Sequence, residues 1–199
     1  MDKNVLAAMT RWPNVPDVFG WLSLSTQGQW RLHPRGDADL CGPGEPISSL
    51  RILHFIDHNY TCDPQGRWYF QNGPQRVFVR LDAAPYILRT TGSRQPLRMQ
   101  THNSLDVHAI SGWWLDESGR LYAQTEHGPG LVAGRDLMEV LESLYTPGHE
   151  SLTTILERSP KPGHAVPIKA EHVNVIYLNF YADAAIPGKL GFIRNPVAA

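Results

Sequence analysis

The sequence predicts an α+β protein, with a small N-terminal α/β lobe followed by a mostly antiparallel β-sheet or partial barrel closed by a helix. Strand-like alternation dominates the first two thirds of the chain, and helical patterns are few. The glycines and prolines are scattered in the manner of turn residues. We expect the 199 residues to form two lobes: residues 1–75 with one amphipathic helix, and residues 76–199 rich in strands with one or two helices.

Two segments have the apolar spacing of an amphipathic helix. Residues 47–58 place leucine, isoleucine and phenylalanine on one wide face, and Ser48 or Ser49 can cap the first turn. Residues 135–145 repeat the pattern and end before a Pro-Gly pair. Residues 151–158 are a shorter third candidate. The second of these helices is the one expected to close the β-rich lobe.

The clearest strand covers residues 76–81, where side chains alternate with a period of two. Val77, Val79 and Leu81 share one face, which we expect to be buried. The other face carries two arginines around Phe78. A preceding strand at residues 68–71 would form a hairpin with it. Further strands are expected at residues 86–90, 97–101, 107–114, 120–125 and 173–181.

A short pattern occurs three times, at residues 24–31, 62–69 and 115–122. Each copy has Ser or Asp at its second position and Gly three residues later, which is the chemistry of a type I turn followed by a residue with positive φ. We therefore predict three β-hairpin tips. A bound ion is the alternative interpretation, but each copy has too few acidic oxygens for a calcium cage.

The composition excludes several protein classes. With 18 basic and 19 acidic residues the formal net charge is −1, so the chain does not bind nucleic acid or anionic membranes through bulk charge. The mean hydropathy of −0.31 excludes an integral membrane protein and global disorder. Two cysteines and a short apolar run at the N-terminus favour the cytoplasm. No glycine-rich phosphate loop occurs, and we expect no cofactor.

Local charge gives the candidate ligand site. Between Arg67 and Arg98 there are six arginines and a single acid, Asp82, together with several aromatic residues. Guanidinium groups bind carboxylates and phosphates, and aromatic rings stack on planar groups. The predicted ligand-binding residues are Arg67, Tyr69, Gln71, Arg76, Phe78, Arg80 and His102. The alternative is a sheet face whose arginines pair with acids elsewhere in the chain.

Two patterns would support catalysis. Cys41, His54, His58 and Cys62 could hold zinc, because the two histidines are four residues apart on the expected helix. Neither cysteine belongs to a C-x-x-C pair, so exposed histidines and small buried thiols are the simpler interpretation. His102, at the end of a strand, has the chemistry of an acid or base. No G-x-S-x-G motif occurs, and no residue is assigned as catalytic.

The order of these motifs resembles proteobacterial protein families of unknown function. The resemblance rests on GQW at 28–30, GEPI at 44–47, GRWYF at 66–70, NGPQRV at 72–77, DAAPY at 82–86, QTH at 100–102, DESGRLY at 116–122 and GFIRNP at 191–196. It implies a compact α+β protein of two small lobes, the second mostly β. The resemblance brings no established activity, so no functional residue is carried over.

These observations favour a non-catalytic binding or regulatory module for a small anionic molecule or a protein partner. The first alternative is a hydrolase that uses His102 or zinc, and the second is a single-stranded RNA binder that stacks bases on its aromatic residues. Nucleic acid and membrane partners are not expected, and the sequence leaves the oligomeric state open.

Overall fold

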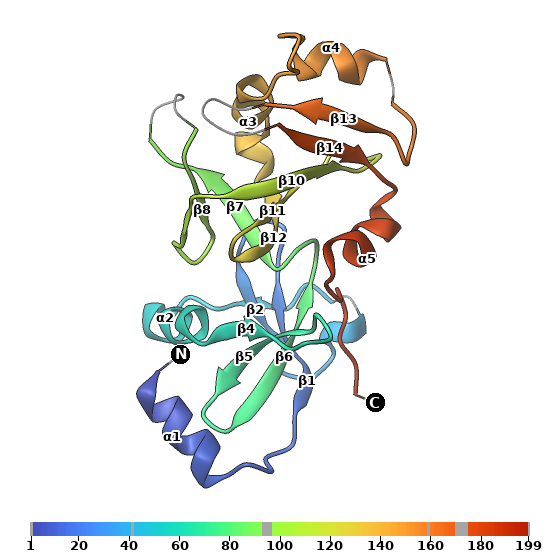
Figure 1. Ribbon diagram of the computed structural model, residues 1–199. Coiled ribbons are helices and arrows are strands. Elements are labelled where there is room, and N and C mark those ends of the chain that lie inside the picture. Colours follow the sequence, from blue (N-terminus) through green and yellow to red (C-terminus); the bar gives the residue numbers. More distant parts are fainter. Residues whose placement is uncertain (1, 41, 93–96, 159, 170–174, 199) are drawn as a thin grey trace. The chain divides into compact units, whose positions relative to one another are not determined.

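The computed structural model describes residues 2–40, 42–92, 97–158, 160–169 and 175–198. It confirms the α+β class, with 24% of residues helical and 36% in strands. The chain divides into two compact units, Met1–Pro85 together with Gly191–Ala199, and Tyr86–Leu190. Each unit is built on a sheet of its own (Figure 1).

The first unit contains a six-stranded sheet in the order β3-β2-β1-β6-β5-β4. Its strands are β1 (Val18–Leu24), β2 (Trp30–Leu32), β3 (Glu45–Pro46), β4 (Tyr60–Cys62), β5 (Trp68–Asn72) and β6 (Gln75–Leu81). The helical elements of this unit are α1 (Lys3–Arg11), the 3-10 turn η1 (Ala38–Leu40) and α2 (Leu50–His58). The helix expected at residues 47–58 is therefore present, beginning at Leu50 after the short strand β3.

The second unit contains an eight-stranded sheet in the order β13-β14-β10-β11-β12-β7-β8-β9. Its strands are β7 (Tyr86–Thr90), β8 (Met99–Thr101), β9 (Asp106–Val107), β10 (Ile110–Leu115), β11 (Leu121–Thr125), β12 (Gly128–Val132), β13 (Ala165–Ile168) and β14 (Ile176–Phe180). Its helical elements are η2 (Gly134–Asp136), α3 (Leu137–Ser143), α4 (Leu152–Glu157), η3 (Asp183–Ala185) and α5 (Ile186–Leu190). The helices expected near residues 135–145 and 151–158 are thus confirmed. Residues 173–174 of the expected last strand lie outside the described residues.

The two sheets share one strand topology. In the first sheet, β1 and β6 pair in parallel, and every other neighbouring pair is antiparallel. In the second sheet, the strands from β7 to β12 have the same order and directions, with β7 and β12 as the parallel pair. Strands β13 and β14 extend only the second sheet, along the edge of β10.

All three repeated turns are hairpin tips, as predicted. The N–H groups of Gly28, Gly66 and Gly119 donate to the carbonyl oxygens three residues earlier over 2.9, 3.0 and 3.0 Å. All three glycines have φ between 77° and 80°, which glycine adopts without steric cost. Two copies occupy equivalent places in the two sheets, between β4 and β5 and between β10 and β11.

The division between the units differs from the expected one between residues 75 and 76. Strand β6 pairs with both β5 and β1, so the whole strand belongs to the first sheet, and the first unit extends to Pro85. The segment from Gly191 also returns to this unit, where Arg67 and Ile193 form a parallel bridge. In Figure 1 this red segment runs beside the strands of the first sheet.

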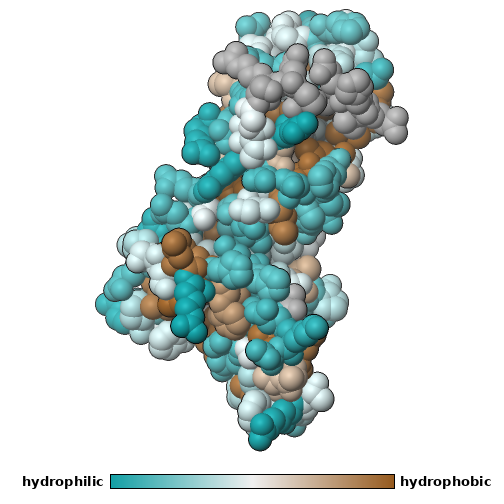
Figure 2. Space-filling model, turned by 90° about the vertical axis from the view of Figure 1, so that its left-hand side faces the viewer, coloured by the Kyte–Doolittle hydropathy of each residue, from teal (hydrophilic) through white to brown (hydrophobic). Residues whose placement is uncertain are grey.

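Each unit has its own buried core. Leu24, Phe78 and Val79 are buried in the first unit, and Leu88 and Leu121 in the second. Figure 2 shows a face on which hydrophilic residues predominate and hydrophobic residues form separate patches. None of the described helices is both long and apolar enough to span a bilayer.

Candidate functional site

Four of the predicted ligand residues form a stack on the first sheet. Tyr69 and Phe78 are cross-strand partners with ring centroids 5.5 Å apart. The Arg76 guanidinium lies 5.3 Å from the centre of the Tyr69 ring, and that of Arg67 lies 4.7 Å from the centre of the Phe78 ring. Phe19 stacks on Phe78 at 4.6 Å, and Phe78 is only 1% exposed. This ring is therefore not available to stack on a base or another planar ligand.

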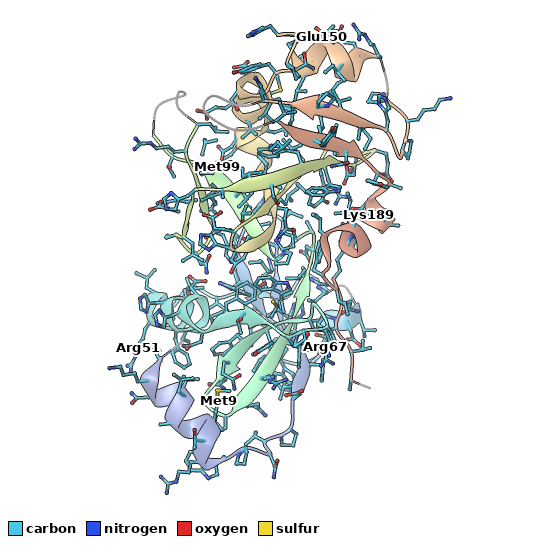
Figure 3. All side chains as sticks on the ribbon, viewed as in Figure 1. Met9, Arg51, Arg67, Met99, Glu150 and Lys189 are labelled. Atoms are coloured by element: carbon cyan, nitrogen blue, oxygen red, sulfur yellow. The ribbon has the colours of Figure 1, made fainter. Side chains whose placement is uncertain are left out.

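Arg67 is held by the repeated turn. Its Nε donates to Asp63 Oδ2 over 2.7 Å, and the other oxygen of Asp63 accepts from the backbone N–H groups of Gln65 and Arg67. Arg120 and Asp116 repeat the same arrangement at 2.8 Å in the second unit. Figure 3 shows Arg67 beside the C-terminal segment, with which it forms a backbone bridge. The side chain thus stabilises a hairpin tip.

This turn gives the first testable prediction, a dependence of stability on pH. Burial by itself would raise the pKa of Asp63, but the hydrogen bonds from the backbone and guanidinium of Arg67 outweigh it, so the pKa is lowered. The stabilisation is then complete above the unfolded pKa of about 3.9 and is lost as the pH falls through the lower folded value. We expect Asp63→Asn to cost about 2 kcal/mol at pH 7 and to lose less further stability than wild type between pH 5 and pH 2. Urea denaturation at each pH measures this, and parallel curves for the two proteins would contradict it.

Gln71 and His102 are not part of the stack. Gln71 is 1% exposed on β5, its Nε2 donates to the Gly73 carbonyl oxygen, and its Oε1 has no partner among the described residues. His102 belongs to the second unit, where its Nδ1 accepts from the N–H of Ile87 over 3.3 Å. Burial, with the charge of Arg89, lowers the pKa of His102 to about 3. The ring is therefore neutral near pH 7 and offers no positive charge to an anion.

Arg80 alone of the predicted residues lines a cavity of about 580 Å³ in the first unit, which we call the arginine cavity. Three arginines line it: Arg31 from β2, Arg80 from β6 and Arg194 from the C-terminal segment. Asp82 is the single acidic residue among the described residues of its wall. The remaining wall residues are Ser25, Thr26, Gln27, Gly42, Pro43, Leu81 and Asn195.

Strand register brings two of the arginines together. Ser23 on β1 pairs with Arg31 on β2 and with Arg80 on β6, so the three residues form a row across three strands. Cross-strand partners point to the same face of a sheet. Arg194 is placed by its own backbone, because its carbonyl oxygen accepts from Leu81 N–H over 2.7 Å. Its Nε donates to the Ala83 carbonyl oxygen over 3.2 Å.

The guanidinium groups of Arg31, Arg80 and Arg194 each donate to a backbone carbonyl oxygen, and Arg80 also pairs with Asp82. Arg31 donates to the Pro43 carbonyl oxygen over 2.8 Å and forms no ion pair within the described part of the chain. Arg80 is 8% exposed, and its Nη2 forms an ion pair with Asp82 Oδ1 at 2.8 Å. The Nε atoms of Arg31 and Arg80 have no hydrogen-bond partner in residues the structure describes. The described wall of the arginine cavity thus combines three arginines with one carboxylate.

A buried histidine lies close to the same strands and was missed by the sequence analysis. His33 Nε2 is 2.9 Å from Ser23 Oγ, and its Nδ1 is 3.8 Å from Asp37 Oδ1. Burial and the charge of Arg80 lower the pKa of His33. The residue types are those of a catalytic triad, but Ser23 is fully buried and 3.8 Å exceeds a hydrogen bond. The group supports the sheet beside the arginine cavity and offers no accessible nucleophile.

The residues of the zinc alternative do not form a metal cluster in the described structure. His54 and His58 stack with ring centroids 6.2 Å apart, and His58 Nε2 lies 3.5 Å from Asp2 Oδ1. Cys62 is a free, exposed cysteine, and Cys41 lies outside the described residues. No group of three metal-ligating side chains occurs among the residues described.

Comparison with known proteins supplies the family. A family model described as "Protein of unknown function (DUF2946)", under the name DUF2944, matches residues 1–197. The chain belongs to this family. The predicted membership of a family of unknown function is thereby confirmed. No curated protein matches the sequence.

Two solved structures are similar to this DUF2944 chain. One is a DUF1285 family protein from Silicibacter pomeroyi DSS-3, with a TM-score of 0.51 and 13% identity over 87% of this chain and 86% of that one. The other is a DUF1285 family protein from Shewanella baltica OS155, with a TM-score of 0.44 and 14% identity over 61% of this chain and 90% of that one. The first likeness supports the fold and nothing beyond it.

Proposed function

We propose that the chain is a non-catalytic module that binds a small anionic ligand in the arginine cavity. The observation that carries this proposal is the convergence of Arg31, Arg80 and Arg194 on one cavity, with Asp82 as the single acidic residue of its described wall. Guanidinium groups bind phosphate and carboxylate with two parallel hydrogen bonds, which makes arginine the residue best suited to such ligands.

The volume of the arginine cavity and the hydrogen bonds that hold its arginine side chains support the same proposal. Ligand cavities commonly span roughly 300–1,000 Å³, and the arginine cavity has about 580 Å³. Its arginines are already held by hydrogen bonds to backbone carbonyls, so binding would lose little side-chain freedom. A regulatory role, binding of a protein partner and a cytoplasmic location stay predictions from the sequence.

Replacing Arg31 or Arg194 with methionine tests the proposal. A hydrogen bond to a charged group contributes about 1.5–3 kcal/mol, so we expect each change to weaken binding of inorganic phosphate at least tenfold. Methionine keeps the unbranched aliphatic stem, and neither arginine is fully buried, so the unfolding midpoint should change little. Isothermal titration calorimetry at fixed ionic strength measures the affinity, and thermal unfolding measures the stability.

Arg76→Met is the matched control, because Arg76 stacks on Tyr69 and does not line the arginine cavity. This variant should bind phosphate as wild type does. Equal losses in all three variants would show that only the overall charge matters. Wild-type protein that binds no phosphate at millimolar concentration would also overturn the proposal.

A further inference from the structure

The wall of the arginine cavity points to a class of ligand. We propose that the ligand is a phosphorylated polyol, of which a sugar phosphate is the simplest example; this inference rests on the proposed function. The arginines would bind the phosphate group, and the neutral polar side chains of the wall would bind the hydroxyl groups.

The neutral polar residues of the wall match hydroxyl groups. Ser25 and Thr26 carry hydroxyls, and Gln27 and Asn195 carry amides that both donate and accept hydrogen bonds. The side chains of Thr26 and Asn195 are exposed and make no hydrogen bond to another described residue. Their hydrogen-bonding capacity is therefore available to a ligand that donates and accepts, as hydroxyl groups do.

Asp82 discriminates against a second anionic group. Its Oδ1 forms an ion pair with Arg80, whereas its Oδ2 makes no hydrogen bond within the described residues, and the side chain is 34% exposed. A carboxylate in the wall repels a further phosphate or carboxylate but accepts a hydrogen bond from a hydroxyl group. This favours a ligand with one phosphate and several hydroxyls over a diphosphate or a tricarboxylate.

The wall also lacks what a nucleobase requires. None of its described residues is aromatic, and the stacked ring of Phe78 belongs to a different part of the sheet face. Proteins commonly bind unpaired bases by stacking them on aromatic rings or arginine planes. The edges of the guanidinium groups here contact carbonyl oxygens and Asp82. The described wall therefore presents no surface that is arranged for a base to stack on.

Calorimetric titration of the full chain distinguishes the ligand classes. The probes are ribose 5-phosphate, glucose 6-phosphate, inorganic phosphate, ribose, adenosine monophosphate and citrate, at one pH and ionic strength. We expect the two sugar phosphates to bind at least tenfold more tightly than inorganic phosphate, and ribose not to bind. Adenosine monophosphate and citrate should bind no more tightly than inorganic phosphate.

The variant Thr26→Ala/Asn195→Ala supplies the internal control. It should weaken sugar-phosphate binding about tenfold, because two hydrogen bonds to hydroxyl groups are lost, and it should weaken phosphate binding less. Sugar phosphates that bind no better than phosphate would overturn this inference and leave the anion site standing. Tightest binding by citrate or adenosine monophosphate would overturn the ligand class. Failure of every phosphate compound to bind would instead overturn the proposed function.

Discussion

Gly66→Ala is expected to destabilise the first unit by about 3 kcal/mol, which combines the strain of a non-glycine residue at positive φ with overpacking. Gly66 has φ +78°, and an added Cβ would lie 2.3 Å from the carbonyl oxygen of Gly191. The opposing atoms are backbone, so the contact can be relieved only if the hairpin tip and the C-terminal segment move apart. Urea denaturation followed by tryptophan fluorescence measures the loss.

Gly119→Ala is the matched control for this change. Gly119 occupies the equivalent turn in the second unit at φ +80°, and an added Cβ there meets no atom within 4 Å. Only the strain of the positive φ is left, so we expect a loss of about 1 kcal/mol. Similar losses in the two variants would contradict a role for the returning segment. Since that segment carries Arg194, Gly66→Ala should also weaken phosphate binding, whereas Gly119→Ala should not.

The hairpin tips could be predicted from the sequence because their chemistry is local. At Asp63 and Asp116 the carboxylate accepts from backbone N–H groups two and four residues later, and Ser25 Oγ does the same. The glycine that ends each turn is one of few residues that tolerate its φ. All the interacting groups lie within five residues, so a short pattern is sufficient to identify them.

The faces of β6 show where such patterns stop being informative. The period of two correctly separates Phe78 from Val77 and Val79, but it does not tell whether the second face is covered. Phe19, on the strand β1 that is distant in the sequence but pairs with β6, stacks on Phe78 and buries it. A residue that sequence alternation assigns to an outward face is thus inside the unit, because burial depends on the partner strand.

The arginine cavity depends on still longer-range pairing. Arg31 and Arg80 converge only because β1 pairs with β2 on one side and, in parallel, with β6 on the other. Arg194 joins them because the chain returns from the second unit to the first. No local sequence signal encodes either event, so composition pointed to arginine and aromatic residues without showing which arginines lie together.

Arg80→Met is expected to weaken phosphate binding about 100-fold, as two charge-assisted hydrogen bonds would, and to destabilise the first unit. Removing one member of a fully buried ion pair costs about 3–5 kcal/mol. Asp82 is 34% exposed and can be rehydrated, so we expect a smaller loss of about 2 kcal/mol. Calorimetry and urea denaturation measure the two effects separately.

The double variant Arg80→Met/Asp82→Asn separates binding from stability. It removes the carboxylate that the single change leaves without its partner, so part of the lost stability should return. Phosphate binding should stay weak, because the guanidinium group that is nine-tenths buried beside Arg31 is still missing. If the double variant regained wild-type affinity, the effect of Arg80→Met on binding would come from repulsion by Asp82, and Arg80 would serve only to neutralise that carboxylate.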